Sequence, residues 1–123
     1  MTTADITLYG LAKCSTCLKA RQWLRERGAE AGFIDYRDQP LSAEELLRWS
    51  RELGGWEKLV NRASMTWRNL PEARKSPESD EQWLGLIAEF PALVRRPLAV
   101  WPDGAVTVGF NEKKFLDRLE RAE

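Results

Sequence analysis

The chain has 123 residues, with 19 lysines and arginines, 19 aspartates and glutamates, and no histidine. The net charge of zero leaves no basic surplus for direct nucleic-acid binding, and no apolar run approaches the roughly 20 residues of a membrane span. Without histidine, one chain cannot form a Cys–His or Ser–His–Asp nucleophilic site or a His-ligated metal centre. The length predicts a single domain over residues 1–123 with a core of its own.

The first predicted element is a strand over residues 6–9, because its β-branched and aromatic residues fit a pleated surface. A turn over 10–13 follows, and then a helix over 15–27 with the only two cysteines, Cys14 and Cys17, at its start. A helix start favours anions through unpaired N–H groups and the macrodipole, which predicts a Cys14 thiolate nucleophile. Lys13 adds positive charge beside it. Cys17, one turn later, is suited to attack a mixed disulfide at Cys14.

Two other interpretations of the cysteine pair stay open. Zinc or an iron–sulfur cluster would have to be shared across a dimer, because a structural zinc site needs about four ligands. The cysteines could instead be small buried apolar residues without chemistry. A Cys-x-x-Cys pair that follows a strand, in a chain without metal partners, favours redox chemistry over both.

The first helix has amphipathic spacing, with Leu18, Ala20, Trp23 and Leu24 on its apolar side and Gly28 as the expected C-cap. A second strand is predicted over residues 32–36. A strand–helix–strand order implies a parallel pair with a right-handed crossover.

Residues 41–93 carry no strand signal and are predicted to be a helical insertion. Ser42 and Glu45 fit a capping box, and Gly54-Gly55 should end the helix that they begin. The further expected elements are short helices at 56–60 and 65–70, an exposed loop over 71–79, and a helix capped by Asp80 with Trp83, Leu84, Ile87 and Ala88 on its apolar side.

The last part of the chain predicts a hairpin of residues 98–101 and 105–108 around a Pro-Asp-Gly turn. Asn111 should cap a final helix that carries Phe115, Leu116 and Leu119. The element order is βαβ, a helical block, and ββα. It predicts an α/β fold with a thioredoxin-like, mixed four-stranded sheet and a helical insertion at about 41–93.

Four segments carry a family resemblance. They are Cys14-Ser15-Thr16-Cys17, Asn61-Arg62 with Thr66-Trp67-Arg68-Asn69-Leu70, Arg95-Arg96-Pro97, and Val108-Gly109-Phe110-Asn111-Glu112. In this order and spacing they resemble the arsenate reductase/Spx/YffB family of ArsC-type, thioredoxin-like proteins over about residues 6–120. The resemblance implies a thioredoxin-like fold with a helical insert.

The resemblance also implies roles for individual residues. Cys14 would attack an oxyanion or accept a mixed disulfide, and the family's anion-binding arginines match Arg62 and Arg96. A third arginine of the arsenate reductases falls at about Gly109, which disfavours arsenate because a doubly charged oxyanion benefits from bidentate arginine contacts. Thioredoxin-like folds place a cis-proline opposite the active-site cysteine, and Pro97 matches it.

We therefore predict a thiol–disulfide oxidoreductase of the arsenate reductase/Spx family. Its predicted catalytic residues are Cys14, Cys17 and Arg96, and its predicted substrate-binding residues are Arg62, Lys13 and Pro97. No bound cofactor or metal is expected, and glutathione would serve as co-substrate. The alternatives are an Spx-like regulator, whose Cys14–Cys17 disulfide switches binding to the C-terminal domain of the RNA polymerase α subunit, and a true arsenate reductase.

The expected partners are glutathione or a protein thiol or disulfide, with the RNA polymerase α subunit under the regulator alternative and no nucleic acid or membrane. Residues 1–5 lack the basic region and apolar core of a signal peptide, so we expect a cytoplasmic protein. In that compartment the dithiol would be mostly reduced at rest. We expect a monomer.

Overall fold

A computed structural model of the chain describes residues 6–122. The chain divides into two compact units: one comprises the residues up to Gln39 and from Arg96 onward, and the other comprises Pro40–Arg95. The single-domain interpretation stays a prediction. Residues 1–5, which suggested the absence of a signal peptide, lie outside the described residues. Within residues 6–122, no helix has the length and apolar character needed to cross a membrane.

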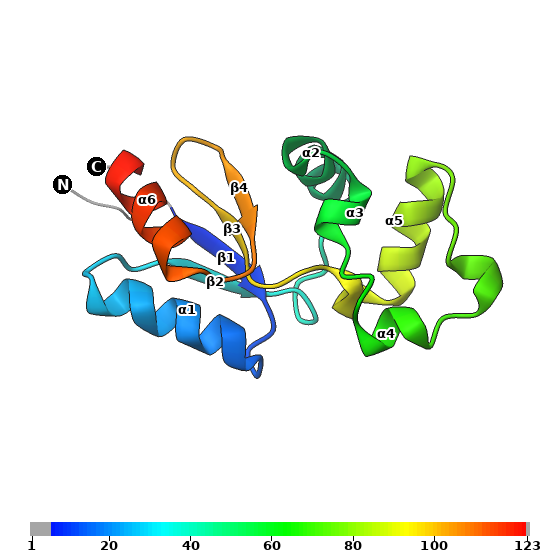
Figure 1. Cartoon of the computed structure of the whole chain (residues 1–123), viewed down its shortest axis with the longest axis horizontal. Helices are drawn as coiled ribbons and strands as arrows, with labels where there is room; N and C mark the ends of the chain where they lie inside the picture. The colour runs from blue at the N-terminus through cyan, green and yellow to red at the C-terminus, as the bar shows by residue number, and fades with distance from the viewer. Residues whose placement is uncertain (1–5, 123) are drawn as a thin grey trace. The chain divides into compact units, whose positions relative to one another are not determined.

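The first unit contains a mixed four-stranded sheet in the order β2-β1-β3-β4 (Figure 1). Strand β1 (Thr7–Gly10) pairs in parallel with β2 (Gly32–Asp35) and antiparallel with β3 (Leu98–Val100), which pairs antiparallel with β4 (Val106–Val108). The parallel pair is joined through helix α1 (Ser15–Glu26), because parallel strands need a long crossover. The predicted thioredoxin-like sheet is confirmed. Individual strand ends differ from the prediction by one residue.

The core of this unit joins α1 and the last helix, α6 (Glu112–Ala122), to the sheet. The Trp23 ring on α1 meets the Phe115 ring on α6 edge-on at 5.9 Å, and Trp101, after β3, meets Phe115 at 5.1 Å. Edge-to-face contacts of this kind add to the stabilisation from burial. The buried members of the core are Ile6, Leu8, Ala20, Trp23, Leu24, Ala29, Ala99, Trp101, Phe115 and Leu119.

Three details of these two helices differ from the prediction. Leu18 and Leu116, expected on the apolar faces, are 50% and 46% exposed. The amphipathic pattern does not distinguish a core position from a flanking one, because the width of the buried stripe depends on what packs against it. The C-cap of α1 is Arg27 rather than Gly28.

The second unit consists of short helices and two 3₁₀ turns. They are α2 (Ala43–Leu53), α3 (Trp56–Leu59), α4 (Met65–Arg68), η1 (Glu72–Arg74), α5 (Asp80–Glu89) and η2 (Pro91–Leu93). An isolated antiparallel bridge joins Val60 and Val94. The η1 turn lies inside the stretch 71–79 that was expected to be only a loop.

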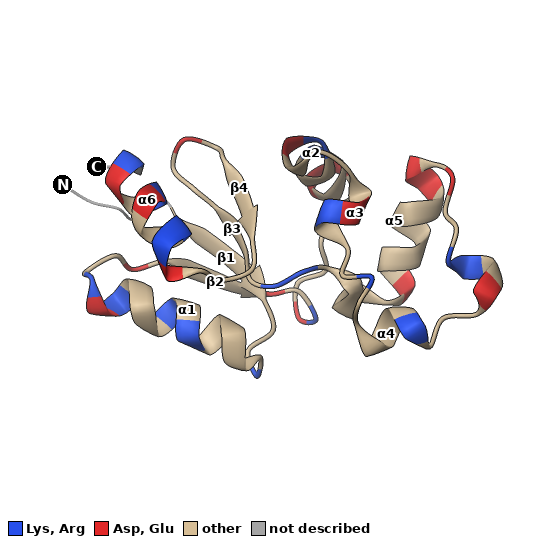
Figure 2. Ribbon diagram, in the orientation of Figure 1, with Lys and Arg blue, Asp and Glu red and all other residues tan. Residues whose placement is uncertain are grey.

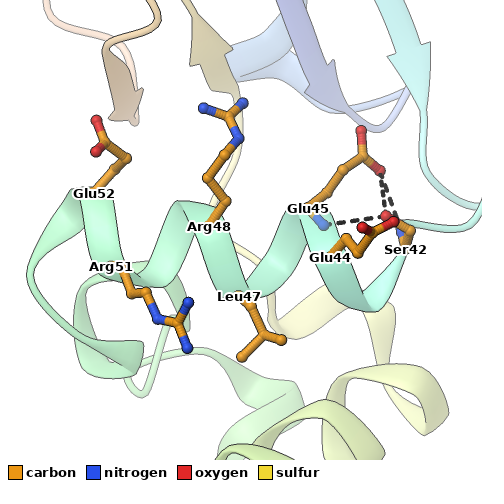
Figure 3. A pocket seen from close by; sticks show the side chains of 7 residues that line it. All are labelled: Ser42, Glu44, Glu45, Leu47, Arg48, Arg51 and Glu52. Carbon is orange, nitrogen blue, oxygen red and sulfur yellow. Dashed lines mark hydrogen bonds between the residues drawn. The ribbon is translucent and has the colours of Figure 1, made fainter.

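Helix α2 has the start and end that the sequence predicts. The Glu45 N–H donates to Ser42 Oγ at 3.1 Å, and the Ser42 N–H donates to Glu45 Oε1 at 3.2 Å, which forms the capping box (Figure 3). Gly54 ends the helix in the left-handed conformation, with φ of 96°, and its N–H bonds the carbonyls of Ser50 and Arg51.

The start of α5 corrects the prediction. Ser79, not Asp80, is the N-cap, and its hydroxyl accepts from the Gln82 N–H at 3.2 Å. Serine and aspartate are comparable caps, so the sequence does not choose between neighbours. The Asp80 carboxylate instead accepts a hydrogen bond from the Trp56 indole at 2.8 Å. On the same helix Ala88 is exposed rather than apolar-facing.

Candidate active site

Cys14 is the N-cap of α1, with extended backbone angles of φ −78° and ψ 123°. The Leu18 N–H donates to the Cys14 carbonyl at 3.0 Å, which makes the first helical hydrogen bond. No acidic residue occupies the first turn of the helix, so no carboxylate there offsets the positive end of its dipole (Figure 2). The predicted position of Cys14 at a helix start is confirmed. Both cysteines are free thiols.

The pKa of Cys14 is lowered. Partial burial acts to raise the pKa, but four hydrogen-bond donors together outweigh it. They are the N–H and thiol of Cys17, the N–H of Thr16 and the side chain of Arg96. Since the thiolate is the nucleophilic form, this environment favours reaction at Cys14.

Cys17 has the opposite environment. It is fully buried, and burial raises its pKa to about 11. The Leu11 N–H acts against this rise, while the hydrogen bond with Cys14 and the negative charge there add to it. At neutral pH Cys17 therefore stays a protonated thiol that donates to the Cys14 sulfur.

Gly10 is the residue that allows Cys17 to lie where it does. A Cβ atom at Gly10 would be 2.5 Å from Cys17 Sγ, closer than real side chains approach. Gly10 is predicted to lie in a turn, whereas the structure includes it in β1. A glycine in a strand often marks a close approach of another group. Gly10 is therefore the sequence signal that could have predicted this contact with Cys17.

Arg96 and Pro97 lie directly before β3, and the peptide bond between them is cis, as the resemblance implied. Arg96 Nη1 donates to the Tyr36 hydroxyl at 3.3 Å, and the Arg96 side chain also hydrogen-bonds Cys14. The Pro97 carbonyl accepts from the Gly109 N–H at 2.9 Å. The structure thus brings together the three residues predicted to be catalytic, Cys14, Cys17 and Arg96.

Asp35, which no sequence pattern singles out, supports the loop before the nucleophile. Its Oδ2 accepts from the Ala12 N–H and its Oδ1 from the Arg37 N–H, both at 2.8 Å. These donors, first that of Ala12, lower the pKa of Asp35. Lys13 is exposed in the same loop, and its predicted substrate contact stays a prediction.

Arg62 belongs to the helical unit, where its side chain contacts Glu57 and Trp67. Its Nη1 is 3.9 Å from Glu57 Oε2, and its guanidinium lies 5.4 Å from the centre of the Trp67 ring. Trp67 stacks on Trp83 at 6.0 Å, and Trp83 stacks on Trp56 at 6.0 Å. The predicted role of Arg62 in substrate binding stays a prediction.

Gly109 stands where arsenate reductases are expected to have a third arginine. Its φ of 81° lies in the left-handed region, where an arginine would be strained. Within residues 6–122, no group of three or more His, Cys, Asp or Glu side chains is arranged to hold a metal ion.

The chain matches the family model of the ArsC family over residues 9–117. The chain belongs to the ArsC family. An uncharacterized protein of Haemophilus influenzae is 39% identical to this ArsC-family protein over 110 residues, which cover 89% of this chain and 95% of the relative. The global transcriptional regulator Spx of Bacillus subtilis is 31% identical over 125 residues, which cover 95% and 91%.

The fold of this ArsC-family protein is shared with a solved structure of a protein named YFFB. The two superpose with a TM-score of 0.84 at 34% identity, covering 94% of this chain and 99% of the other. The predicted membership in the arsenate reductase/Spx/YffB family is therefore confirmed, together with the thioredoxin-like fold.

Proposed function

We propose that this ArsC-family protein is a thiol–disulfide reductase whose nucleophile is the Cys14 thiolate. One observation carries the proposal: Cys14 is the N-cap of α1, where four hydrogen-bond donors lower its pKa despite partial burial. A thiol with a lowered pKa is more fully ionised at neutral pH, and the thiolate attacks disulfides.

The reaction begins with attack of the Cys14 thiolate on one sulfur of a disulfide. The S–S bond breaks, a mixed disulfide forms at Cys14, and the leaving thiolate takes a proton from water. A second thiol then attacks the Cys14 sulfur and releases the reduced substrate. If glutathione is this thiol, it is left in a mixed disulfide with Cys14. A second glutathione attacks the glutathione sulfur of that mixed disulfide, which releases the Cys14 thiolate and forms oxidised glutathione, so two glutathione molecules reduce one disulfide.

Cys17 offers an internal route for the second step. Its attack would form a Cys14–Cys17 disulfide, which an external thiol such as glutathione must then reduce. While Cys14 is a thiolate, the pKa of Cys17, which burial raises to about 11, keeps Cys17 protonated. Once Cys14 is in a mixed disulfide, its negative charge no longer opposes ionisation of Cys17.

The remaining residues of the proposal bind the substrate. Arg96 stabilises the thiolate, and the backbone beside Pro97 would pair with the bound disulfide. Arg62 and Lys13 would contact anionic groups of glutathione, since guanidinium and ammonium groups bind carboxylates.

The test is turnover of a model disulfide, hydroxyethyl disulfide, with glutathione, followed by consumption of NADPH by glutathione reductase. We expect many turnovers per protein molecule, loss of turnover in Cys14→Ser, and retained turnover in Cys17→Ser if glutathione completes the second step. If the natural chain turns over the disulfide and Cys14→Ser turns it over equally fast, Cys14 is not the nucleophile. If the natural chain shows no turnover, the proposed reductase function is rejected.

A second candidate is a redox-switched regulator, which the 31% identity to Spx and the two neighbouring thiols favour. Such a protein would oxidise once, form the Cys14–Cys17 disulfide and change its affinity for the C-terminal domain of the RNA polymerase α subunit. Binding to that domain, measured before and after one equivalent of oxidant, distinguishes the regulator from an enzyme.

Arsenate in place of the disulfide tests the third alternative, arsenate reduction. This alternative predicts that arsenate causes consumption of the reductant and that Cys14→Ser abolishes this consumption.

A further inference from the structure

Tyr36 connects the end of β2 to the Arg96 guanidinium. Its N–H donates to the Gly10 carbonyl at 3.0 Å, and the residue is only 1% exposed. Its hydroxyl oxygen accepts a hydrogen bond from Arg96 Nη1 at 3.3 Å. Since the Arg96 side chain also hydrogen-bonds Cys14, one guanidinium bridges the buried phenol and the nucleophile.

We propose that Tyr36 is a positioning residue, whose hydroxyl holds the Arg96 guanidinium against the Cys14 sulfur. The proposal rests on the proposed function, because it adds a residue to the same site. Tyr36 gains and loses no bond or electron in the reaction. It acts on Cys14 only through Arg96.

A phenol suits this task because it stays neutral. Burial raises the pKa of Tyr36, against the lowering by Arg96, so the hydroxyl keeps its proton at neutral pH. A carboxylate at the same place would orient the guanidinium but would also neutralise its charge, which would weaken the effect of Arg96 on Cys14. The neutral acceptor fixes the long arginine side chain and leaves its full charge available to the thiolate.

Among the described residues, the titratable groups that interact with Cys14 lie in three segments of the first unit. Cys17 lies on α1, Arg96 lies before β3, and Tyr36 lies after β2. The chain's other tyrosine, Tyr9, precedes Gly10 in β1, and successive side chains of a strand point to opposite faces. Because Gly10 faces the Cys17 sulfur, Tyr9 points away from it, and Tyr9→Phe is a matched control.

The test is the rate of Cys14 alkylation by iodoacetamide against pH, with the labelled cysteine identified by mass spectrometry. In Tyr36→Phe we expect the inflection to rise by about half a pH unit and the rate near pH 7 to fall about threefold. Tyr9→Phe should leave both unchanged. An unchanged inflection in Tyr36→Phe would overturn the proposal. Thermal unfolding of each variant checks that the fold is retained.

The background of Arg96→Ala separates positioning from any direct effect of the phenol. With Arg96 removed, Tyr36→Phe should cause no further shift of the inflection. A shift of the same size in that background would overturn the proposal, because Tyr36 would then act without Arg96. The alkylation rates can be measured whether or not the protein turns over disulfides. Expected shifts of the alkylation inflection without disulfide turnover would therefore reject the proposed reductase function and support the positioning role of Tyr36.

Discussion

Replacement of Gly10 by alanine tests the close approach on which the Cys17 position depends. The added Cβ would lie 2.5 Å from Cys17 Sγ, which is fully buried and belongs to a helix packed in the core. Overpacking of this kind typically costs about 1–3 kcal/mol. An alanine in place of a strand glycine otherwise stabilises by about 0.5–1 kcal/mol. The net loss expected is therefore between about 0 and about 2.5 kcal/mol.

Gly32→Ala is the matched control, because Gly32 also lies in a strand and a Cβ there meets nothing closer than the Ile6 carbonyl at 4.0 Å. The gain from replacing a glycine is common to both variants. The difference between them in the free energy of unfolding therefore isolates the contact with Cys17, and should be about 1–3 kcal/mol. Urea unfolding under reducing conditions measures it.

Removal of the sulfur should remove the difference. In a Cys17→Ala background, Gly10→Ala and Gly32→Ala should agree within about 0.5 kcal/mol, the usual limit of additivity. Two results would refute the reasoning: equal stabilities of the two glycine variants in the natural chain, or a difference that persists without the Cys17 sulfur.

Two further predictions concern pH. The pKa of Asp35 is lowered, chiefly by the Ala12 N–H, so the Asp35 carboxylate stabilises the fold above its unfolded pKa, and this stabilisation is lost as the pH falls through its folded pKa. The urea midpoint should therefore fall less between pH 6 and pH 2 in Asp35→Asn than in the natural chain. Equal falls in the two proteins would contradict this prediction. The pKa of Cys17 is raised by burial to about 11, so the protein should lose stability as the pH rises from the unfolded value of about 8.5 to about 11. Cys17→Ala should flatten that loss, and an unchanged alkaline slope would assign it to other groups.

The sequence by itself determined the elements whose signals are local. The helix start at Cys14, the capping box of Ser42 and Glu45, and the stop at Gly54 each depend on residues within one turn of each other. The order of these elements was enough to predict the mixed sheet, because a parallel pair requires a crossover and a hairpin requires a turn. Local signals failed where two neighbours were equally suitable, as at Ser79 and Asp80.

Only the tertiary structure added Tyr36 and Asp35 to the surroundings of the nucleophile, beside the predicted Cys17 and Arg96. Tyr36 meets Arg96 across 60 positions of the chain, and Asp35 reaches Ala12 across 23. Both contacts depend on the register that pairs Gly10 with Asp35 in adjacent strands. The sequence around Tyr36 or Asp35 does not predict these contacts. A carboxylate or a phenol at the end of a strand has no specific role unless the sheet places a partner beside it. Helix starts and caps are properties of short segments, whereas the environment of Cys14 is a property of the assembled sheet.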